Sequence, residues 1–170
     1  MVSIDRPRAV RADDAWAVDR DGVWDDPANW LNGTVPDGIG VQVLFGPVIT
    51  APRTVTVQDV LNGQGNDDGV ITVGEITYDS PQTYHIGSQS GVLTLDNGDQ
   101  PVVIRALATQ GSVAQRLSPQ QVRLQGDLIL DSDIAGGVGI YNVVGDDRTV
   151  TKLGRGVGVF NPDDPARSRE

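Results

Sequence analysis

The sequence predicts an all-β protein, and three observations lead to this fold class. Apolar residues make up 38% of the 170 residues and aromatic residues only 5%, so the core must consist mainly of Val, Leu and Ile, which favour strands. Short runs rich in β-branched residues recur along the chain, each bounded by Gly, Asp, Asn or Pro. No apolar residues recur at helical spacing over three turns, and the best candidate helix, residues 106–117, is broken by Gly111.

The strands are expected where these runs lie. Residues 53–58 (RTVTVQ) alternate strictly, which places Val55 and Val57 on one face. Further strands are predicted at residues 41–45, 70–73, 75–78, 83–86, 92–95, 102–105, 121–124, 127–130, 138–141, 149–153 and 157–160. The side chains expected to point into the core are Val55, Val57, Ile71, Val73, Leu93, Leu95, Leu128 and Leu130.

The length predicts one domain, flanked by two polar segments. Residues 1–15 are charged without a regular apolar period and are expected to form an extended N-terminal arm, followed by a β domain over residues 16–160. Residues 161–170 form a polar C-terminal tail in which two prolines remove backbone donors. No apolar run is long enough for a signal peptide or a membrane span, so we expect a protein that is made in the cytoplasm and has no export signal of its own. From Met1 at the start of the chain we expect a whole gene product.

The composition argues against most kinds of chemistry. There is no Cys, which removes disulfides, iron–sulfur clusters, Cys-type zinc sites and a Cys nucleophile, and a single His, His85, disfavours a His-based triad. The net charge of −10 argues against binding nucleic acid through a basic surface. We therefore expect no cofactor, no metal and no enzyme activity. Two weaker alternatives are an Asp pair for glycoside hydrolysis and Asp-rich turns, at residues 66–68 and 131–133, that bind calcium.

Two architectures suit many short strands, an antiparallel sandwich and a solenoid of parallel strands, and the spacing of the runs leaves both open. Residues 22–37 (GVWDDPANWLNGTVPD) favour the second. They resemble the opening motif of proteins with autotransporter-associated β-strand repeats, in which a Trp, an Asn-Trp pair and a Gly-x-x-Pro turn begin a parallel β-helix. Residues 148–160 (RTVTKLGRGVGVF) resemble the segment that closes each such repeat, and Lys152, the one lysine of the chain, falls at the motif's lysine.

The resemblance extends over about residues 20–160, because residues 121–130 also fit the paired strands of the family. It implies a short parallel β-helix with an extended N-terminal arm; the antiparallel β-sandwich is the alternative. The chain departs from the family in having one copy of the closing motif and neither a signal peptide nor a C-terminal membrane barrel.

The opening motif is expected to cover the first coil, because exposed strand edges at the end of a solenoid could pair with other chains. Trp24 and Trp30 would lay their rings over this coil, and Asn29 would bond to the backbone of the turn. The alternative is that Trp16, Trp24 and Trp30 stack on sugar rings, as in a carbohydrate-binding module.

A stand-alone β-helix with charged arms and no chemistry suggests, by analogy, a non-catalytic structural protein: a phage capsid decoration (cement) protein that stabilises the shell. The expected partners are two further copies of the chain, in a homotrimer, and the major capsid protein, with neither nucleic acid nor a membrane. Arg6, Arg8 and Arg11 would anchor the arm on an acidic capsid, so that the protein ends on the virion surface after assembly in the host cytoplasm. The alternative is a phage tail-fibre or adhesin-type module that binds carbohydrate or a receptor.

Overall fold

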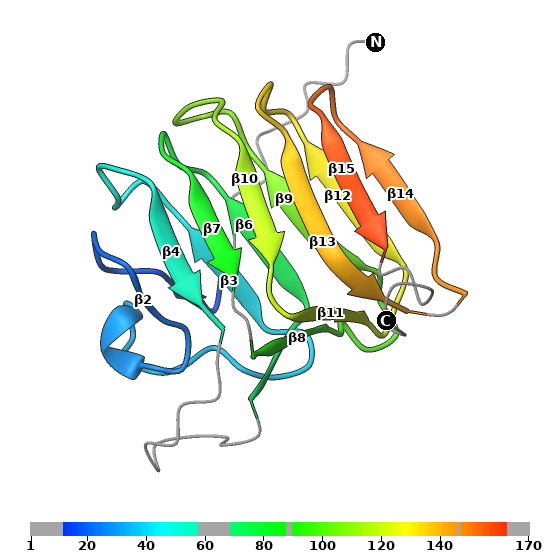
Figure 1. Cartoon of the computed structure of the whole chain (residues 1–170), viewed down its shortest axis with the longest axis horizontal. Helices are drawn as coiled ribbons and strands as arrows, with labels where there is room; N and C mark the ends of the chain where they lie inside the picture. The colour runs from blue at the N-terminus through cyan, green and yellow to red at the C-terminus, as the bar shows by residue number, and fades with distance from the viewer. Residues whose placement is uncertain (1–11, 58–68, 88–89, 146, 163–170) are drawn as a thin grey trace, which may run out of the picture.

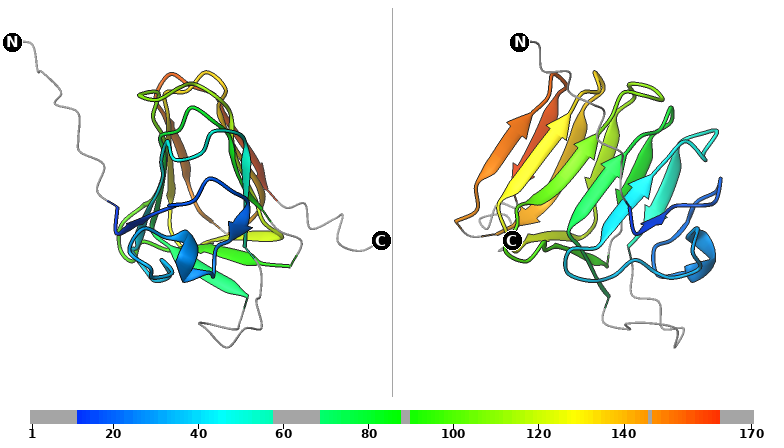
Figure 2. Two further views of the ribbon diagram at one scale, coloured as in Figure 1. Left: turned by 90° about the vertical axis from the view of Figure 1, so that its left-hand side faces the viewer. Right: turned by 180° about the vertical axis from the view of Figure 1, so that it is seen from behind.

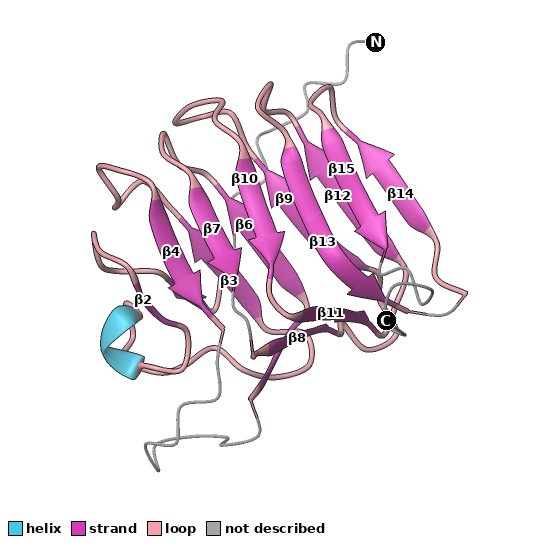
Figure 3. Ribbon diagram, in the orientation of Figure 1, coloured by secondary structure: helices cyan, strands magenta, loops and turns pink. Residues whose placement is uncertain are grey.

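The computed structural model describes residues 12–57, 69–87, 90–145 and 147–162, and within these ranges the protein is all-β. The first strands are β1 (Asp14–Ala15), β2 (Gly22–Val23), β3 (Gln42–Phe45), β4 (Arg53–Thr56), β5 (Val70–Val73), β6 (Glu75–Tyr78), β7 (Tyr84–Gly87) and β8 (Val92–Leu95). They are followed by β9 (Val102–Ala106), β10 (Gln115–Ser118), β11 (Gln121–Leu124), β12 (Leu128–Ser132), β13 (Val138–Val144), β14 (Val150–Leu153) and β15 (Gly158–Pro162). A short 3₁₀ turn, η1 (Pro27–Asn29), is the one helical element in the described part of the chain (Figure 3).

The strands form two sheets, and within each sheet every pair of neighbouring strands is parallel. One sheet has the order β1-β3-β6-β9-β12-β14, and the other has the order β2-β4-β7-β10-β13-β11-β8-β5 with β15 added beside β13 (Figure 1). Strands that follow one another in the sequence do not pair with each other. For example, only Gly74 separates β5 from β6, yet the two strands belong to different sheets. The antiparallel sandwich is therefore wrong, since such a fold pairs consecutive strands through hairpins.

The larger sheet curls beneath the smaller one. The first half of β13 pairs with β10, and its last residues, Val143 and Val144, pair with β11, which carries the sheet around a corner. Figure 2 (left) looks along the rows of strands, hereafter the strand stack, and shows two flanks joined by a base to which β8 and β11 belong. Paired residues are far apart in the chain: Gln42 pairs with Glu75, 33 residues on, and Val138 with Gly158, 20 residues on.

The core lies between these faces. All eight side chains predicted to point inward are at most 4% exposed. The register explains this burial, because parallel pairing places equivalent positions of successive strands side by side: Ile71 pairs with Leu93, and Val73 with Leu95. The apolar side chains that alternate along each strand therefore line up from strand to strand and form a continuous apolar interior.

The ends of the folded part differ slightly from the predicted boundaries. Asp14 and Ala15 form β1 and pair with Val43 and Leu44, so the folded part begins inside the predicted arm. β15 continues to Pro162, two residues into the predicted tail. Backbone pairing to a neighbouring strand needs no apolar side chain, which is why a charged segment with no apolar period can extend a sheet.

Candidate functional site: the two ends of the strand stack

The first end of the stack is filled by aromatic rings. Trp24 and Trp30 pack edge to face with their ring centroids 5.0 Å apart, and Trp16 packs edge to face on Trp30 at 5.3 Å. Phe45 of β3 lies 5.6 Å from Trp24 and 5.0 Å from Tyr84 of β7, so the cluster continues into the core. All three tryptophans are at most 3% exposed. Their rings are therefore covered, and the predicted alternative that they stack on sugars is wrong for this structure.

The polar groups of the opening motif are bonded as well. The Trp24 Nε1 donates to the carbonyl of Pro36 at 3.0 Å, and the Trp30 Nε1 donates to the carbonyl of Trp24 at 2.6 Å. Asn29 is 2% exposed, and its Nδ2 donates to the Val23 carbonyl at 2.9 Å. Side chains thus satisfy backbone carbonyls at the end of β2, where the sheet has no further strand. The expected backbone bond of Asn29 is present.

The same segment covers the edge of the smaller sheet. Residues 29–31 run antiparallel to residues 15–17, with the Ala17 N–H donating to the Asn29 carbonyl and the Leu31 N–H to the Ala15 carbonyl, both at 2.9 Å. η1 sets the approach of this segment: Asp26 caps it by accepting from the Ala28 N–H, and a proline occupies its first turn. The β1–β2 end is therefore closed by the chain itself, beside η1 in Figure 1.

The opposite end is open. Within the described residues β14 pairs only with β12, and β15 only with β13. Val150 and Leu153 of β14 are 36% and 46% exposed, because no strand lies beyond them. The Lys152 Nζ donates to the carbonyls of Ser132, Leu153 and Gly154, so this lysine binds the backbone where the chain leaves β14. These contacts give the lysine of the closing motif a structural role.

The open end also carries an unusual charge. Residues 148–162 contain three bases, Arg148, Lys152 and Arg155, and no acid, and two pairs of aspartates flank this segment, Asp146 and Asp147 before it and Asp163 and Asp164 after it. A surface that combines exposed apolar side chains, unpaired strand edges and local positive charge is suited to contact with an acidic protein surface.

The other predicted candidates are not gathered into a reactive site. Asp131 faces Arg105 at 3.5 Å, and Asp133 accepts from the Arg155 N–H, so both serve the fold. His85 bonds the Ser118 Oγ at 2.7 Å. Among the described residues no three His, Cys, Asp or Glu side chains lie close enough to hold a metal ion, and no helix is long and apolar enough to cross a membrane. Arg6, Arg8 and Arg11 and the turn at residues 66–68 lie outside the described residues.

Sequence reasoning missed the partners of the opening motif. Trp16 and Phe45 stand outside the motif, and the fold brings their rings into contact with each other and with Trp30. A signal did exist: the low aromatic content made each large ring in the first third of the chain a strong core candidate. The open end could also have been suspected, since apolar residues in a single closing motif have no following repeat to cover them.

Replacing Asn29 by alanine is expected to lower the free energy of unfolding by about 1–3 kcal/mol, because the Val23 carbonyl loses its 2.9 Å bond from the buried Asn29 and keeps only the longer bond, 3.4 Å, from the Asp26 N–H. Urea denaturation measures the change. Arg20→Ala is the control: it removes only the 3.1 Å bond from the guanidinium to the Asn29 Oδ1 and should cost less than about 1 kcal/mol. Equal costs for the two variants would contradict the role of Asn29 as the group that closes β2.

Comparisons with protein-family models, with curated proteins and with solved structures found no match to this chain.

Proposed function

We propose that the protein is a short parallel β-helix that serves as a non-catalytic structural protein, a decoration (cement) protein on a viral capsid. The parallel pairing of residues 19–33 positions apart and the curled larger sheet support the β-helix, with each separation corresponding to one coil. In the larger sheet the separation between paired residues is 33 at one end, from Gly22 to Val55, and 20 at the other, from Val138 to Gly158, so the coils at the two ends differ in length.

The observation that carries the proposal is the difference between the ends. The opening motif closes one end with buried rings and side-chain bonds, which prevents chains from adding head to tail into a filament. The other end leaves β14 and β15 as edges. A rigid body with one closed and one open end suits a protein that attaches by the open end to a larger assembly and exposes the rest.

The charge supports the same orientation. Arg148, Lys152 and Arg155 at the open end would face an acidic shell, and the Asp-rich remainder would keep decorated particles from sticking to each other. The proposed homotrimer would place three open ends around a three-fold position of the capsid, where avidity over many copies offsets weak single contacts. The arm with Arg6, Arg8 and Arg11 would add a second anchor.

Leu153→Asp is expected to weaken attachment to undecorated capsids at least about tenfold, because it places a charge among the apolar side chains of the open end. Leu31→Asp is the matched control: Leu31 is 71% exposed at the closed end, and its variant should bind like the wild type. Co-sedimentation with the particles measures both, and equal loss in the two variants would remove the open end as the attachment surface.

Oligomeric state and copy number test the remainder of the proposal. Sedimentation equilibrium should give a trimer, and a strict monomer at high concentration would contradict it. Binding at only a few copies per particle would identify a tail component instead of a cement protein. Deleting residues 1–15 should weaken attachment; unchanged attachment would mean that the arm is no anchor.

The second candidate is a tail-fibre or adhesin-type module that binds carbohydrate. The buried tryptophans do not favour it, but an aromatic and cationic surface on the flank of the larger sheet does.

A further inference from the structure

The outer flank of the larger sheet carries a row of planar side chains. His85 of β7 pairs in register with Arg116 of β10, which pairs in register with Gly139 of β13. Tyr141 lies two residues beyond Gly139 on the same face of β13. The three side chains come from positions 85, 116 and 141, and only the parallel register brings them together.

Two glycines let the rings of this row lie flat against the sheet. A Cβ at Gly139 would stand 2.7 Å from the Tyr141 ring, and one at Gly87 would stand 2.7 Å from the His85 ring. Any larger residue would lift the rings away from the sheet. Each ring therefore packs directly against the backbone of its glycine.

Arg116 lies between the two rings. Its guanidinium carbon is 5.0 Å from the centre of the Tyr141 ring, a cation–π distance that orders both side chains. The charge of Arg116 also contributes to the lowered pKa of His85, after the larger effect of burial. The strands of this flank, β4, β7, β10, β13 and β15, contain no Asp or Glu that could pair with Arg116.

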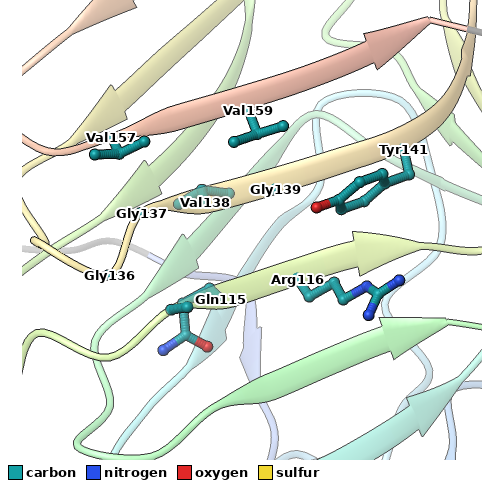
Figure 4. Close-up of a pocket in the computed structure, with 10 residues that line it drawn as sticks. Gln115, Arg116, Gly136, Gly137, Val138, Gly139, Tyr141, Val157 and Val159 are labelled. Carbon is teal, nitrogen blue, oxygen red and sulfur yellow. The ribbon is translucent and has the colours of Figure 1, made fainter.

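A shallow hollow adjoins the row (Figure 4). Gly136, Gly137 and Gly139 lie along its floor. Val157 and Val159 lie on one side, Gln115 and Arg116 on the other, and Tyr141 lies at the end of the hollow. Both valines are about half exposed, at 54% and 45%. The hollow thus offers apolar contact beside a ring face and a charged donor, a combination typical of small-ligand sites.

We propose that this flank binds an acidic saccharide, a sugar ring that carries a carboxylate. The part of the Tyr141 ring that lines the hollow would contact the C–H groups of the sugar, the valines would contact its edge, and the Arg116 guanidinium would donate to the carboxylate. The positive charge of Arg116 beside this hollow favours an anionic ligand over a neutral one. The inference rests on this flank alone and does not depend on attachment through the open end.

Isothermal titration calorimetry with an oligogalacturonate tests the proposal. Wild-type protein should bind it, and Tyr141→Ala and Arg116→Ala should each weaken binding about tenfold through the lost ring contact and the lost charge-assisted bonds. Tyr141→Phe should bind like the wild type, because the ring is kept. Arg123→Ala is the matched control: Arg123 is an exposed arginine on β11, in the base, and its Nε bonds only Gln121.

The probes separate the parts of the proposal. Equal affinity for maltohexaose would overturn the role of the carboxylate, and equal affinity for polyglutamate would overturn the saccharide. No binding of oligogalacturonate by the wild type would overturn the whole site. Arg116 is exposed, so Arg116→Ala still tests the site if Tyr141→Ala fails to fold.

Two further measurements complete the test. Leu153→Asp should leave oligogalacturonate binding unchanged, which distinguishes a failure of this site from a failure of the capsid proposal. Assays for new reducing ends should find none, since the flank offers binding groups without an acid–base pair. Release of reducing ends, abolished by an Asp→Asn change, would overturn a role limited to binding.

Discussion

Trp24→Ala is expected to lower the free energy of unfolding by about 4 kcal/mol, the largest loss of any single truncation at the closed end. Trp24 is fully buried, its ring contacts Trp30 and Phe45, and its Nε1 bonds the Pro36 carbonyl. Alanine would leave a cavity beneath the opening motif and an unpaired carbonyl above it. Denaturation followed by circular dichroism measures the loss.

Leu31→Ala is the control for this change. Leu31 belongs to the same segment, but its side chain is 71% exposed, so the variant should remain within about 0.5 kcal/mol of the wild type. A small loss for Trp24→Ala, close to that of Leu31→Ala, would mean that the ring cluster does not hold the closed end together. Because each coil of a solenoid contacts only its neighbours, the damage should be greatest in the first coils and least at β14 and β15.

Gly136→Ala is expected to cost about 3 kcal/mol, because the turn before β13 lies directly against the turn before β10. A Cβ at Gly136 would stand 2.3 Å from the Ala114 N and 2.6 Å from the Val113 carbonyl carbon. Both are backbone atoms, which cannot rotate away as a side chain could. The two turns would have to separate, and with them the pairing of Gln115 with Val138.

Gly126→Ala is the matched control for Gly136→Ala. Neither glycine has a positive φ, and a Cβ at Gly126 would meet its nearest atom, the Gln100 carbonyl oxygen, at 3.6 Å, an ordinary contact. This variant should be neutral or more stable by less than about 1 kcal/mol, through the reduced entropy of the unfolded chain. A cost for Gly126→Ala equal to that for Gly136→Ala would show that the contact between the two turns does not limit the fold.

Several features of the fold could be predicted because they depend on local pattern. Alternation identified the inward side chains of β4, β5, β8 and β12, and all of them are buried. The opening motif predicted a closed end. In the structure Trp24 and Trp30 are buried there, and Asn29 is bonded to the backbone. Such predictions succeed because the face to which a strand residue points follows from its position modulo two.

Strand β10 shows where local pattern fails. Its residues include one large apolar side chain, Leu117, and no strand was predicted there. In the structure Gln115 occupies an inward position at 3% exposure, where its Oε1 accepts from the Tyr84 N–H and its Nε2 donates to the Gln82 carbonyl. A glutamine becomes acceptable in the interior only because β7 presents these groups, so the strand could not be recognised without its neighbour.

The amino-acid sequence alone determined the all-β class, the inward faces of the predicted strands and the composition of the closed end, because each follows from alternation or from a contiguous motif. Tertiary structure alone decided which strands pair, which end remains open and that His85, Arg116 and Tyr141 share one flank. Parallel pairing joins residues 19–33 positions apart with no turn to set the register. That register depends on the packing of the whole interior, which no local segment of the chain contains.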